Sequence, residues 1–448
     1  MAYATLRYQH PLINAIDRGL NHELLSQSTI GLIYLDVSVL GYLLLFSQFR
    51  FLTQMKIAII GCGYVAEFYL NNIKSHPDFV VQGAFDQNAT RRDEFCRFFS
   101  LKAYPTLEAV LEDSSVEMIL NLTNPRSHFS VSAAAINANK HVYTEKPLGM
   151  DMNEAHLLIN MAKERNVRLG CAPCSVLSDT AQTLWKAIRD GAIGKVRLVY
   201  ANFDDGMIAP KMKPWSWQTK SGAYWPAKDE FEIGCTYEHA GYFLTWLAAF
   251  FGPAQKVTAF SSCQIPDKGI PVDQMAPDFS VGCIEYNDGI VARVTAGLVA
   301  PMDKSLTIIG DNGVLFVPYL RNDQESVLIH RDSTYENQKL VERLLTRVKS
   351  KVESVAKQLQ IRTGHLGYYE KYPMVKTKSF RPAGSGKFVD FFRGPQDMLE
   401  SIQNNRPHRL SGELGLHIVE IIECLQYPQR FNHHKQIQST FPKIQPLI

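Results

Sequence analysis

Residues 55–66 read MKIAIIGCGYVA, an apolar run followed at once by two glycines and a small residue. Residues 56–60 have the length and composition of a buried parallel strand, and residues 65–74 have the spacing of a helix. The glycines therefore fall at a strand-to-helix turn. There Gly61 permits the tight turn, and Gly63 lets a pyrophosphate approach the backbone at the helix N-terminus. The pattern predicts a dinucleotide-binding turn.

An acidic residue follows the next predicted strand. The apolar run 79–85 ends in Asp86, roughly 20 residues after the glycines, where a carboxylate can accept hydrogen bonds from a ribose diol. This spacing favours NAD as the cofactor. Arg91 and Arg92 follow closely and could bind a 2′-phosphate, so NADP stays open as an alternative.

Strands and helices continue to alternate along the chain. Residues 118–122 and 141–143 are predicted strands, with a helix over residues 130–139 between them. Such alternation indicates a doubly wound parallel sheet, which binds its ligands beyond the carboxyl ends of its strands. The polar residues at those ends are Thr123, Asn124, Glu145 and Lys146.

Four motifs together resemble the Gfo/Idh/MocA family of two-domain oxidoreductases. They are Gly61-x-Gly63-x-x-Ala66, Asp86, Asn124-Pro125-x-x-His128 and Glu145-Lys146-Pro147. The resemblance runs from about Met55 to about Gln426 and includes a familiar closing segment from Phe391. It implies an N-terminal Rossmann domain and a C-terminal α+β domain, whose open, mostly antiparallel sheet carries the substrate site.

The resemblance also implies roles for individual residues. Lys146 is expected beside the nicotinamide and the reacting hydroxyl. The expected cofactor-binding residues are those of the glycine turn and the strand ends: Gly61, Gly63, Tyr64, Val65, Asp86, Thr123, Asn124, His128, Glu145 and Lys146.

A second part of the site depends on the alignment register. Family members carry Asp-x-Gly-x-His at the start of a helix that ends in a glycine. Aligning His239 with the motif histidine puts Cys235 at the Asp position and misses the closing glycine. A shift of three residues places Glu238 at the Asp position, Tyr242 at the His position and Gly252 at the close. The second register is preferred.

The preferred register predicts a proton acceptor on this helix. A phenol such as Tyr242 can accept the proton of an alcohol if a neighbouring cation, here Lys146, lowers its pKa. Glu238 is expected to orient the substrate or relay the proton, and His239 is a reserve because histidine titrates near neutrality. Which of the three acts as acid/base stays open. Tyr242 could instead be an aromatic packed on the sheet.

Residues 207–231 are rich in aromatic and charged side chains. They include Trp215, Trp217, Tyr224 and Trp225, with four lysines among them. Aromatic faces beside charged donors suit a pyranose, but aromatics are equally enriched at subunit interfaces. Both interpretations stay open.

Composition sets outer limits on the class of protein. The chain has 448 residues, of which 46% are hydrophobic and 20% charged, as in soluble proteins of two or more domains. A net charge of +3 gives no indication of nucleic-acid binding. Cys171-x-x-Cys174 has no second pair at zinc spacing, so no metal site is predicted. Cys62 in the phosphate turn favours a reducing cytoplasm.

Three segments are predicted from these patterns: a Rossmann domain over 55–175, an α+β substrate and oligomerisation domain over 176–448, and an extension over 1–54. The extension contains an apolar run, 30–46, that is short for a membrane span. A mis-assigned start is preferred over a membrane-associated segment. A basic amphipathic helix over 338–362 is expected to dock on the surface rather than on a membrane.

The predicted function is that of an NAD(P)-dependent oxidoreductase acting on a hydroxyl of a sugar, cyclitol or nucleotide-sugar. Two alternatives stay open, both from the resemblance: a glycosidase that uses a tightly bound NAD, and a non-catalytic dinucleotide sensor. A homodimer or homotetramer in the cytoplasm is expected, with no nucleic-acid partner.

Overall fold

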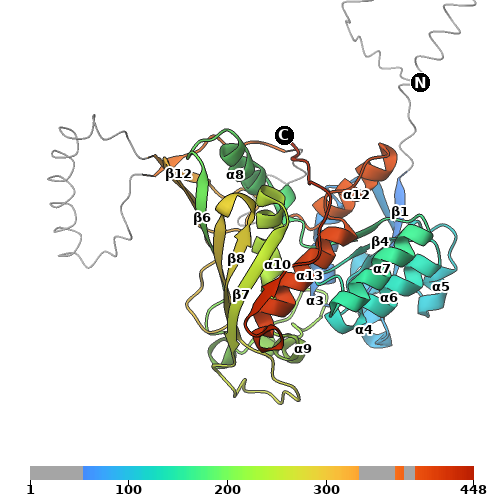
Figure 1. Ribbon diagram of the computed structural model, residues 1–448. Helices are drawn as coiled ribbons and strands as arrows, with labels where there is room; N and C mark the ends of the chain where they lie inside the picture. The colour runs from blue at the N-terminus through green and yellow to red at the C-terminus, as the bar shows by residue number, and fades with distance from the viewer. Residues whose placement is uncertain (1–53, 332–368, 378–388) are drawn as a thin grey trace, which may run out of the picture. The chain divides into compact units, whose positions relative to one another are not determined.

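The computed structural model describes residues 54–331, 369–377 and 389–448 (Figure 1). Within them, a first sheet contains five parallel strands in the order β2-β1-β3-β4-β5. The strands are β1 (Met55–Ile60), β2 (Phe79–Phe85), β3 (Met118–Asn121), β4 (His141–Thr144) and β5 (Leu169–Cys171). This is the doubly wound sheet that the sequence predicts.

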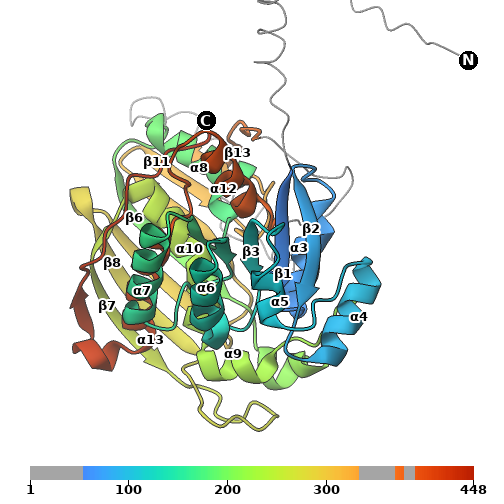
Figure 2. The same ribbon diagram turned by 90° about the vertical axis from the view of Figure 1, so that its right-hand side faces the viewer.

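Helices cover both faces of the first sheet. They are α3 (Tyr64–Ile73), α4 (Ala89–Phe99), α5 (Leu107–Leu111), α6 (His128–Asn137), α7 (Met152–Glu164) and α12 (Arg393–Gln403). Side chains alternate along β1: Ile57 and Ile59 pack in the same core as α3, α4 and α12, whereas Ala58 and Ile60 pack in the core of α5, α6 and α7. Figure 2 shows α6 and α7 side by side. A sheet buried on both faces explains the continuous apolar run of β1.

The second sheet contains nine described strands in the order β13-β12-β11-β10-β6-β9-β8-β7-β14. All neighbours are antiparallel except β6 and β9. The strands are β6 (Val196–Asp204), β7 (Ala254–Ser262), β8 (Phe279–Tyr286), β9 (Val291–Gly297), β10 (Leu306–Gly310), β11 (Gly313–Val317), β12 (Leu328–Arg331), β13 (Glu370–Lys371) and β14 (His434–Gln436). The predicted fold class is confirmed in both halves.

Two long helices pack on one face of the second sheet (Figure 1). These are α10 (Cys235–Phe251) and α13 (Gly412–Gln426), with α8 (Asp179–Arg189) and α9 (Ala227–Ile233) beside them. α10 is buried along nearly its whole length, because it contacts the sheet on one side and α13 on the other. α13 also contacts α7 and β5 of the first sheet, so it joins the two halves.

Several predictions concern segments or boundaries rather than the sheets themselves. The predicted domain boundary at 175 and 176 falls where the chain passes from β5 to α8, and it stays a prediction. Residues 1–53 of the predicted extension and the predicted basic helix over 338–362 lie outside the described residues. Among the described helices, none has the length and apolarity needed to span a bilayer.

Candidate functional site

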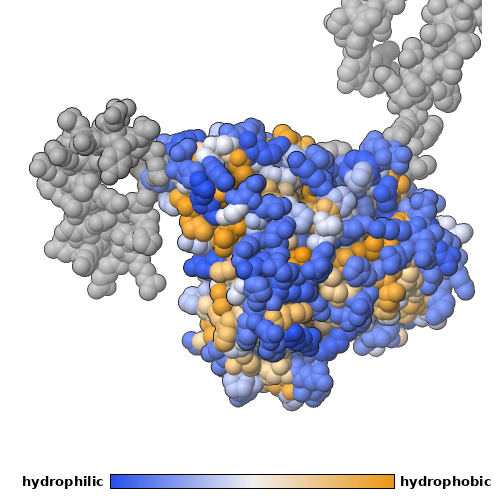
Figure 3. All heavy atoms as spheres, viewed as in Figure 1, coloured by the Kyte–Doolittle hydropathy of each residue, from blue (hydrophilic) through white to orange (hydrophobic). Residues whose placement is uncertain are grey.

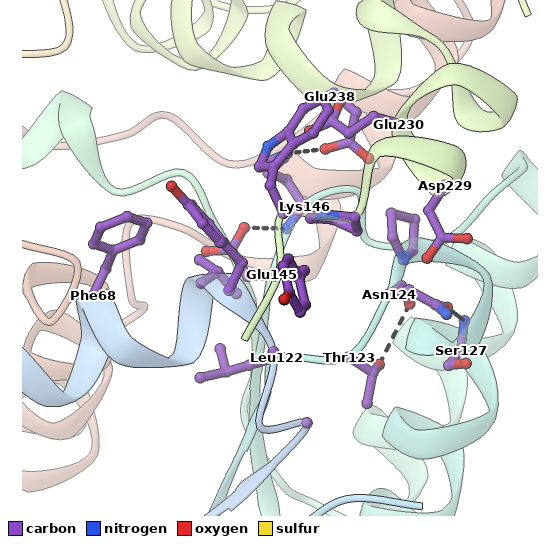
Figure 4. A pocket seen from close by; sticks show the side chains of 18 of the residues that line it. Phe68, Leu122, Thr123, Asn124, Ser127, Glu145, Lys146, Asp229, Glu230 and Glu238 are labelled. Carbon is purple, nitrogen blue, oxygen red and sulfur yellow. Dashed lines mark hydrogen bonds and ion pairs between the residues drawn. The ribbon is translucent and has the colours of Figure 1, made fainter. Parts of the chain in front are cut away.

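A cavity of about 700 Å³ lies where the carboxyl ends of the first sheet meet α9, α10 and the second sheet. Its wall combines the glycine turn after β1, the residues after β2, β3 and β4, and the first turns of α10. Figure 4 shows Glu238 and Glu230 at one end of a set of lining residues and Leu122 and Thr123 at the other, with Lys146 between them. Among the predicted site residues, all except His128 line this cavity.

The glycine turn has the geometry that a dinucleotide requires. Gly61 has a φ of 98°, and an added Cβ would lie 2.6 Å from the backbone of Leu122. Gly63 is the N-cap of α3, where no side chain caps the helix and where an added Cβ would meet no atom within 4 Å. A Cβ there would fill the open space in front of the helix N-terminus. The turn therefore fits a pyrophosphate.

Asp86 lines the cavity at the predicted ribose position, but its carboxylate already has four donors. Oδ2 accepts from the Cys62 N–H (2.9 Å) and from Arg91 Nε (2.9 Å). Oδ1 accepts from the Asn88 N–H (2.8 Å) and from Arg91 Nη2 (2.7 Å). A ribose diol must therefore displace Arg91, whose side chain is 43% exposed, to reach both oxygens.

The loop after β3 lies at the cavity, but only some of its predicted cofactor-binding residues line it. Thr123 and Asn124 line the cavity. His128 does not: it is fully buried, with Nδ1 2.7 Å from the Pro147 carbonyl and Nε2 3.1 Å from the Thr123 carbonyl. Burial lowers the pKa of His128. His128 therefore holds two cavity loops together and makes no direct contact with the space where a cofactor would lie.

Lys146 reaches across the cavity to α10. Its Nζ forms an ion pair with Glu238 Oε2, and both side chains are largely buried. Burial lowers the pKa of Lys146, but the Glu238 carboxylate and Tyr242 more than compensate, so the pKa lies above its ordinary value. The adjacent Glu145 accepts a hydrogen bond from the Tyr69 hydroxyl (2.8 Å). Lys146 is therefore a fixed positive charge at the junction of the two sheets.

The predicted residues of α10 share one face of the helix. Glu238 and Tyr242 are one turn apart, and His239 lies beside them, so all three line the cavity. The helix begins at Cys235, three residues before Glu238, which the preferred register places at the helix start, and its C-cap is Gly252, which has a φ of 80°. The closing glycine of the preferred register is therefore the residue that ends the helix. The catalytic roles of the three residues stay predictions.

Lys146 lowers the pKa of Tyr242 as predicted, but the net pKa of the phenol is raised rather than lowered. Burial raises the pKa of the phenol, and the opposing effects of Arg321 and Lys146 do not outweigh it. The ring stacks on Phe203 of β6, with 5.0 Å between centroids and 12° between planes. Tyr242 thus packs on the sheet and also lines the cavity, and its role as acid/base stays a prediction.

His239 forms a dyad with a carboxylate that the sequence analysis missed. Its Nε2 lies 3.1 Å from Asp205 Oδ2, and Asp205 also pairs with Lys304. Burial lowers the pKa of His239 to about 4, so the prediction of titration near neutrality is wrong. An acceptor at Nε2 favours the tautomer with its proton there. Nδ1 is then a lone-pair acceptor, and it has no hydrogen-bond partner among the described residues.

The cavity lining also includes charged residues that no motif identified, among them Asp205, Glu230, Lys304 and Arg321. Asp205 directly follows β6, so its strand-end position is a signal that could have been used. Glu230 lies in α9, and burial together with the Glu238 charge raises its pKa well above the ordinary value. Arg321 comes shortly after β11, in a loop with no spacing pattern.

The aromatic segment before α10 contributes to the same cavity. Trp217, Tyr224 and Trp225 line it, and Trp217 and Trp225 pack against each other with centroids 5.6 Å apart. Trp215 instead packs over Gly269. These three side chains therefore lie at the cavity, while sugar binding and a contact with a second subunit both stay predictions.

The two cysteines at and just after the end of β5 do not line this cavity. Cys171 and Cys174 are buried free thiols, and burial raises both of their pKa values. Within the described residues, no group of three or more His, Cys, Asp or Glu side chains is arranged to hold a metal ion.

Comparison with known proteins agrees with the fold. Residues 55–172 match the family described as "Oxidoreductase family, NAD-binding Rossmann fold", and residues 181–316 match the "GFO/IDH/MocA C-terminal domain". The combination defines a nicotinamide-dependent oxidoreductase with a Rossmann sheet and an open second sheet. The chain belongs to the Gfo/Idh/MocA family.

Individual relatives show what this chain is similar to. UDP-N-acetylglucosamine 3-dehydrogenase of Acidithiobacillus ferrooxidans is 32% identical over 116 residues, 26% of this chain and 36% of the relative. Myo-inositol 2-dehydrogenase of Thermotoga maritima is 27% identical over 142 residues, 32% of this chain and 42% of the relative. These matches thus span less than half of either relative. A structure of levoglucosan dehydrogenase with NADH and levoglucosan has a TM-score of 0.65 at 18% identity, covering 86% of this chain and all of that one.

Proposed function

We propose that this oxidoreductase transfers hydride between a nicotinamide cofactor and a hydroxyl-bearing carbon of a sugar, cyclitol or nucleotide-sugar. The observation that carries the proposal is one continuous cavity, which joins the open glycine turn to the Lys146–Glu238 pair and Tyr242. The relatives named for their action on UDP-N-acetylglucosamine, myo-inositol and levoglucosan support this substrate class.

We propose NAD as the preferred cofactor, held by the glycine turn and by Asp86 once Arg91 moves aside. When bound, the cofactor supplies a hydride acceptor or donor. Thr123, Asn124 and Glu145 line the cavity beyond the strand ends, where the nicotinamide half of a dinucleotide lies in this sheet type. NADP is the alternative, because Arg91 is close enough to Asp86 to meet a 2′-phosphate.

The protein's own residues handle the proton of the reacting hydroxyl. Burial keeps the Tyr242 phenol protonated, so it can donate a hydrogen bond to the substrate oxygen. The positive charge of Lys146 stabilises negative charge that develops on that oxygen. In the direction of oxidation the hydroxyl proton must leave. Nδ1 of His239 is the proposed acceptor: it is buried and has no hydrogen-bond partner among the described residues, so the substrate or a water must reach it by a shift of the ring. Glu238 fixes Lys146 in place.

The test of the function measures reduced nicotinamide by absorbance. The full chain is assayed with NAD and with NADP against sugars, inositols and nucleotide-sugars. Turnover with one substrate class supports the proposal. Net hydrolysis without cofactor turnover points to the glycosidase alternative, and dinucleotide binding without any turnover points to the sensor.

A lysine variant tests the site itself. Lys146→Ala is expected to lower kcat strongly while cofactor affinity stays within about tenfold, because the charge acts on the reacting oxygen. Lys163→Ala is the matched control, since Lys163 is 65% exposed and pairs with Glu413 at the surface. Unchanged kcat in Lys146→Ala removes this lysine from the mechanism.

We also propose that the chain assembles as a homodimer or homotetramer through its second sheet. Leu198 of β6 and Phe260 of β7 are exposed apolar side chains on this sheet, 39% and 52% exposed. Figure 3 shows hydrophobic residues at the surface near these strands. Light scattering of the purified chain tests the assembly, and a monomer at micromolar concentration contradicts it.

A further inference from the structure

Arg321 is a cation in the cavity wall whose N–H groups have no acceptor among the residues that the structure describes. Its guanidinium carbon lies 4.8 Å from the centroid of the Tyr242 ring, so the group stacks on the proposed proton donor. Among the described residues, no carboxylate lies within ion-pair distance of Arg321, and no oxygen accepts a hydrogen bond from it. The side chain is partly buried.

The other cations of the cavity wall differ from Arg321 in this respect. The described Lys and Arg residues in the wall are Arg91, Lys146, Lys304 and Arg321. The first three pair with Asp86, Glu238 and Asp205 respectively. Arg321 alone among the four has no carboxylate partner, so its charge is the one available to a ligand.

Two carboxylates whose charges act on Arg321, those of Asp205 and Glu145, already have other partners. Asp205 binds Lys304 and His239, and Glu145 accepts from Tyr69. Burial lowers the pKa of Arg321, but Tyr242 and Asp205 raise it above its ordinary value, so the guanidinium stays charged. A guanidinium presents five donors in a planar fork that matches a carboxylate or a phosphate. The Tyr242 ring lies against this guanidinium, with 4.8 Å between the guanidinium carbon and the ring centroid.

We propose that Arg321 is an anion subsite and that the substrate carries a carboxylate or phosphate close to the oxidised carbon, as in a sugar acid or a sugar phosphate. The inference rests on the proposed function, because it places the anion beside the Tyr242 phenol. It narrows the substrate class: one small molecule supplies both the reacting hydroxyl and the anion.

A second source of phosphate is the cofactor itself. The charge of Arg321 lowers the pKa of Tyr64, the first residue of α3 at the glycine turn, although burial raises that pKa overall. The cofactor's pyrophosphate would lie near that helix terminus. The experiment must therefore separate an effect on cofactor binding from an effect on substrate binding.

The test compares Arg321→Gln and Arg321→Lys with the wild-type chain. Calorimetry measures NADH and NADPH binding alone, and then the binding of glucuronate, glucose 6-phosphate and glucose to the chain saturated with the cofactor. Arg293→Gln is the matched control, because Arg293 stacks on Tyr200 at 4.3 Å on an exposed strand position outside the cavity. Thermal unfolding reports whether each variant folds.

The expected result is a loss of roughly ten- to a hundredfold in affinity for the better of the two anionic ligands in Arg321→Gln, because hydrogen bonds to a charged group are lost. Arg321→Lys should recover part of the loss, while glucose and cofactor affinities and all Arg293→Gln values change by less than about threefold. Equal losses for glucose and the anions, or wild-type binding of neither anion, overturn the proposal. Weaker cofactor binding alone assigns Arg321 to the pyrophosphate and also overturns it.

The binding assay does not depend on turnover. If the wild-type chain binds an anion through Arg321 but oxidises none of the panel, the proposed function fails while the anion subsite stands. If Arg321→Gln does not fold, Arg321→Lys supplies the comparison, because it keeps the charge and loses the planar fork.

Discussion

Tyr242 and His239 lie side by side on α10, and burial acts on them in opposite senses. It raises the pKa of the phenol and lowers that of the imidazole, so both groups are neutral at pH 7. Lys146 and Lys304 also lower the pKa of His239 and so favour the neutral ring, whereas Asp205 and Glu238 raise it. In the proposed mechanism the neutral imidazole is the proton acceptor for alcohol oxidation, and the protonated phenol is the proton donor for the reverse reduction.

The first prediction at this scale concerns pH. Because the pKa of His239 is about 4 in the folded chain, kcat/KM should show no inflection near 6.5 and should fall only towards pH 4, where the ring gains a proton. The free energy of unfolding should likewise fall as the pH falls. The unfolded chain takes up this proton below its ordinary pKa of 6.5 and the folded chain only near 4, so the contribution is complete above pH 6.5 and is lost between the two values. pH profiles of the wild-type chain and of His239→Asn check this. An inflection near 6.5 that disappears in the variant contradicts a neutral buried histidine.

A second prediction concerns cofactor choice. Arg91→Ala removes the bidentate partner of Asp86 and frees both carboxylate oxygens for a ribose diol. It should weaken NADPH binding roughly tenfold or more, because a charged phosphate contact is lost, and leave NADH binding equal or tighter. Fluorescence titration with both cofactors measures this.

The reciprocal variant, Asp86→Ala, should weaken NADH binding more than NADPH binding. Arg92→Ala is the control, because Arg92 pairs with Asp93 rather than with Asp86. Equal losses for both cofactors in Asp86→Ala contradict the proposed preference for NAD.

At the scale of elements, α10 is bounded by two glycines that adopt backbone conformations other residues rarely reach. Gly234 has a φ of 98° and Gly252 a φ of 80°. An added Cβ at Gly234 would lie 2.6 Å from the side-chain amide of Gln426 in α13, whereas one at Gly252 would meet no atom within 4 Å. The Gln426 amide donates to the Ile233 carbonyl (2.6 Å), so the start of α10 is tied to α13.

These contacts predict unequal effects of two similar substitutions. Gly252→Ala should lower the free energy of unfolding by about 1–3 kcal/mol through backbone strain alone. Gly234→Ala should lower it further and also reduce kcat/KM, because α13 must shift and the start of α10 carries Glu238 and His239. Urea unfolding and steady-state assays measure both effects. Equal destabilisation with unchanged kcat/KM in Gly234→Ala would show that the Gln426 contact does not set the position of α10.

The same elements show how far sequence reasoning reaches. β1, the glycine turn and α3 are contiguous, and local spacing alone predicts them. The start of α10 was missed because Gly234 provides no side-chain cap signal before Cys235. The Asp205–His239 dyad and the Arg321–Tyr242 stack join residues from separate strands and loops. No local period encodes such contacts, since they depend on how the second sheet packs on α10.

At the scale of the whole molecule, a buried arginine connects four distant segments. Arg393 in α12 donates to Asp323 Oδ2 (2.9 Å), to the Leu177 carbonyl (2.9 Å) and to Thr377 Oγ1 (2.8 Å). Its guanidinium also lies 3.8 Å from Asp179. Arg393 is 7% exposed, and the two carboxylates are 1% exposed. One side chain therefore neutralises two buried charges where α12, α8 and the loop after β11 meet.

Removing this arginine should destabilise the whole described fold rather than one loop. Arg393→Met keeps much of the apolar stem but leaves Asp323 and Asp179 buried without their cation, which is expected to cost about 3–5 kcal/mol of unfolding free energy. The matched control is Arg197→Met, which removes a bidentate pair with Asp311 at the surface and should change stability little, since solvent screens exposed pairs. Urea unfolding monitored by tryptophan fluorescence and by circular dichroism distinguishes the outcomes. Coincident transitions at lower urea for Arg393→Met support a cooperative connection, whereas two separated transitions would show that the network stabilises only the segments it touches.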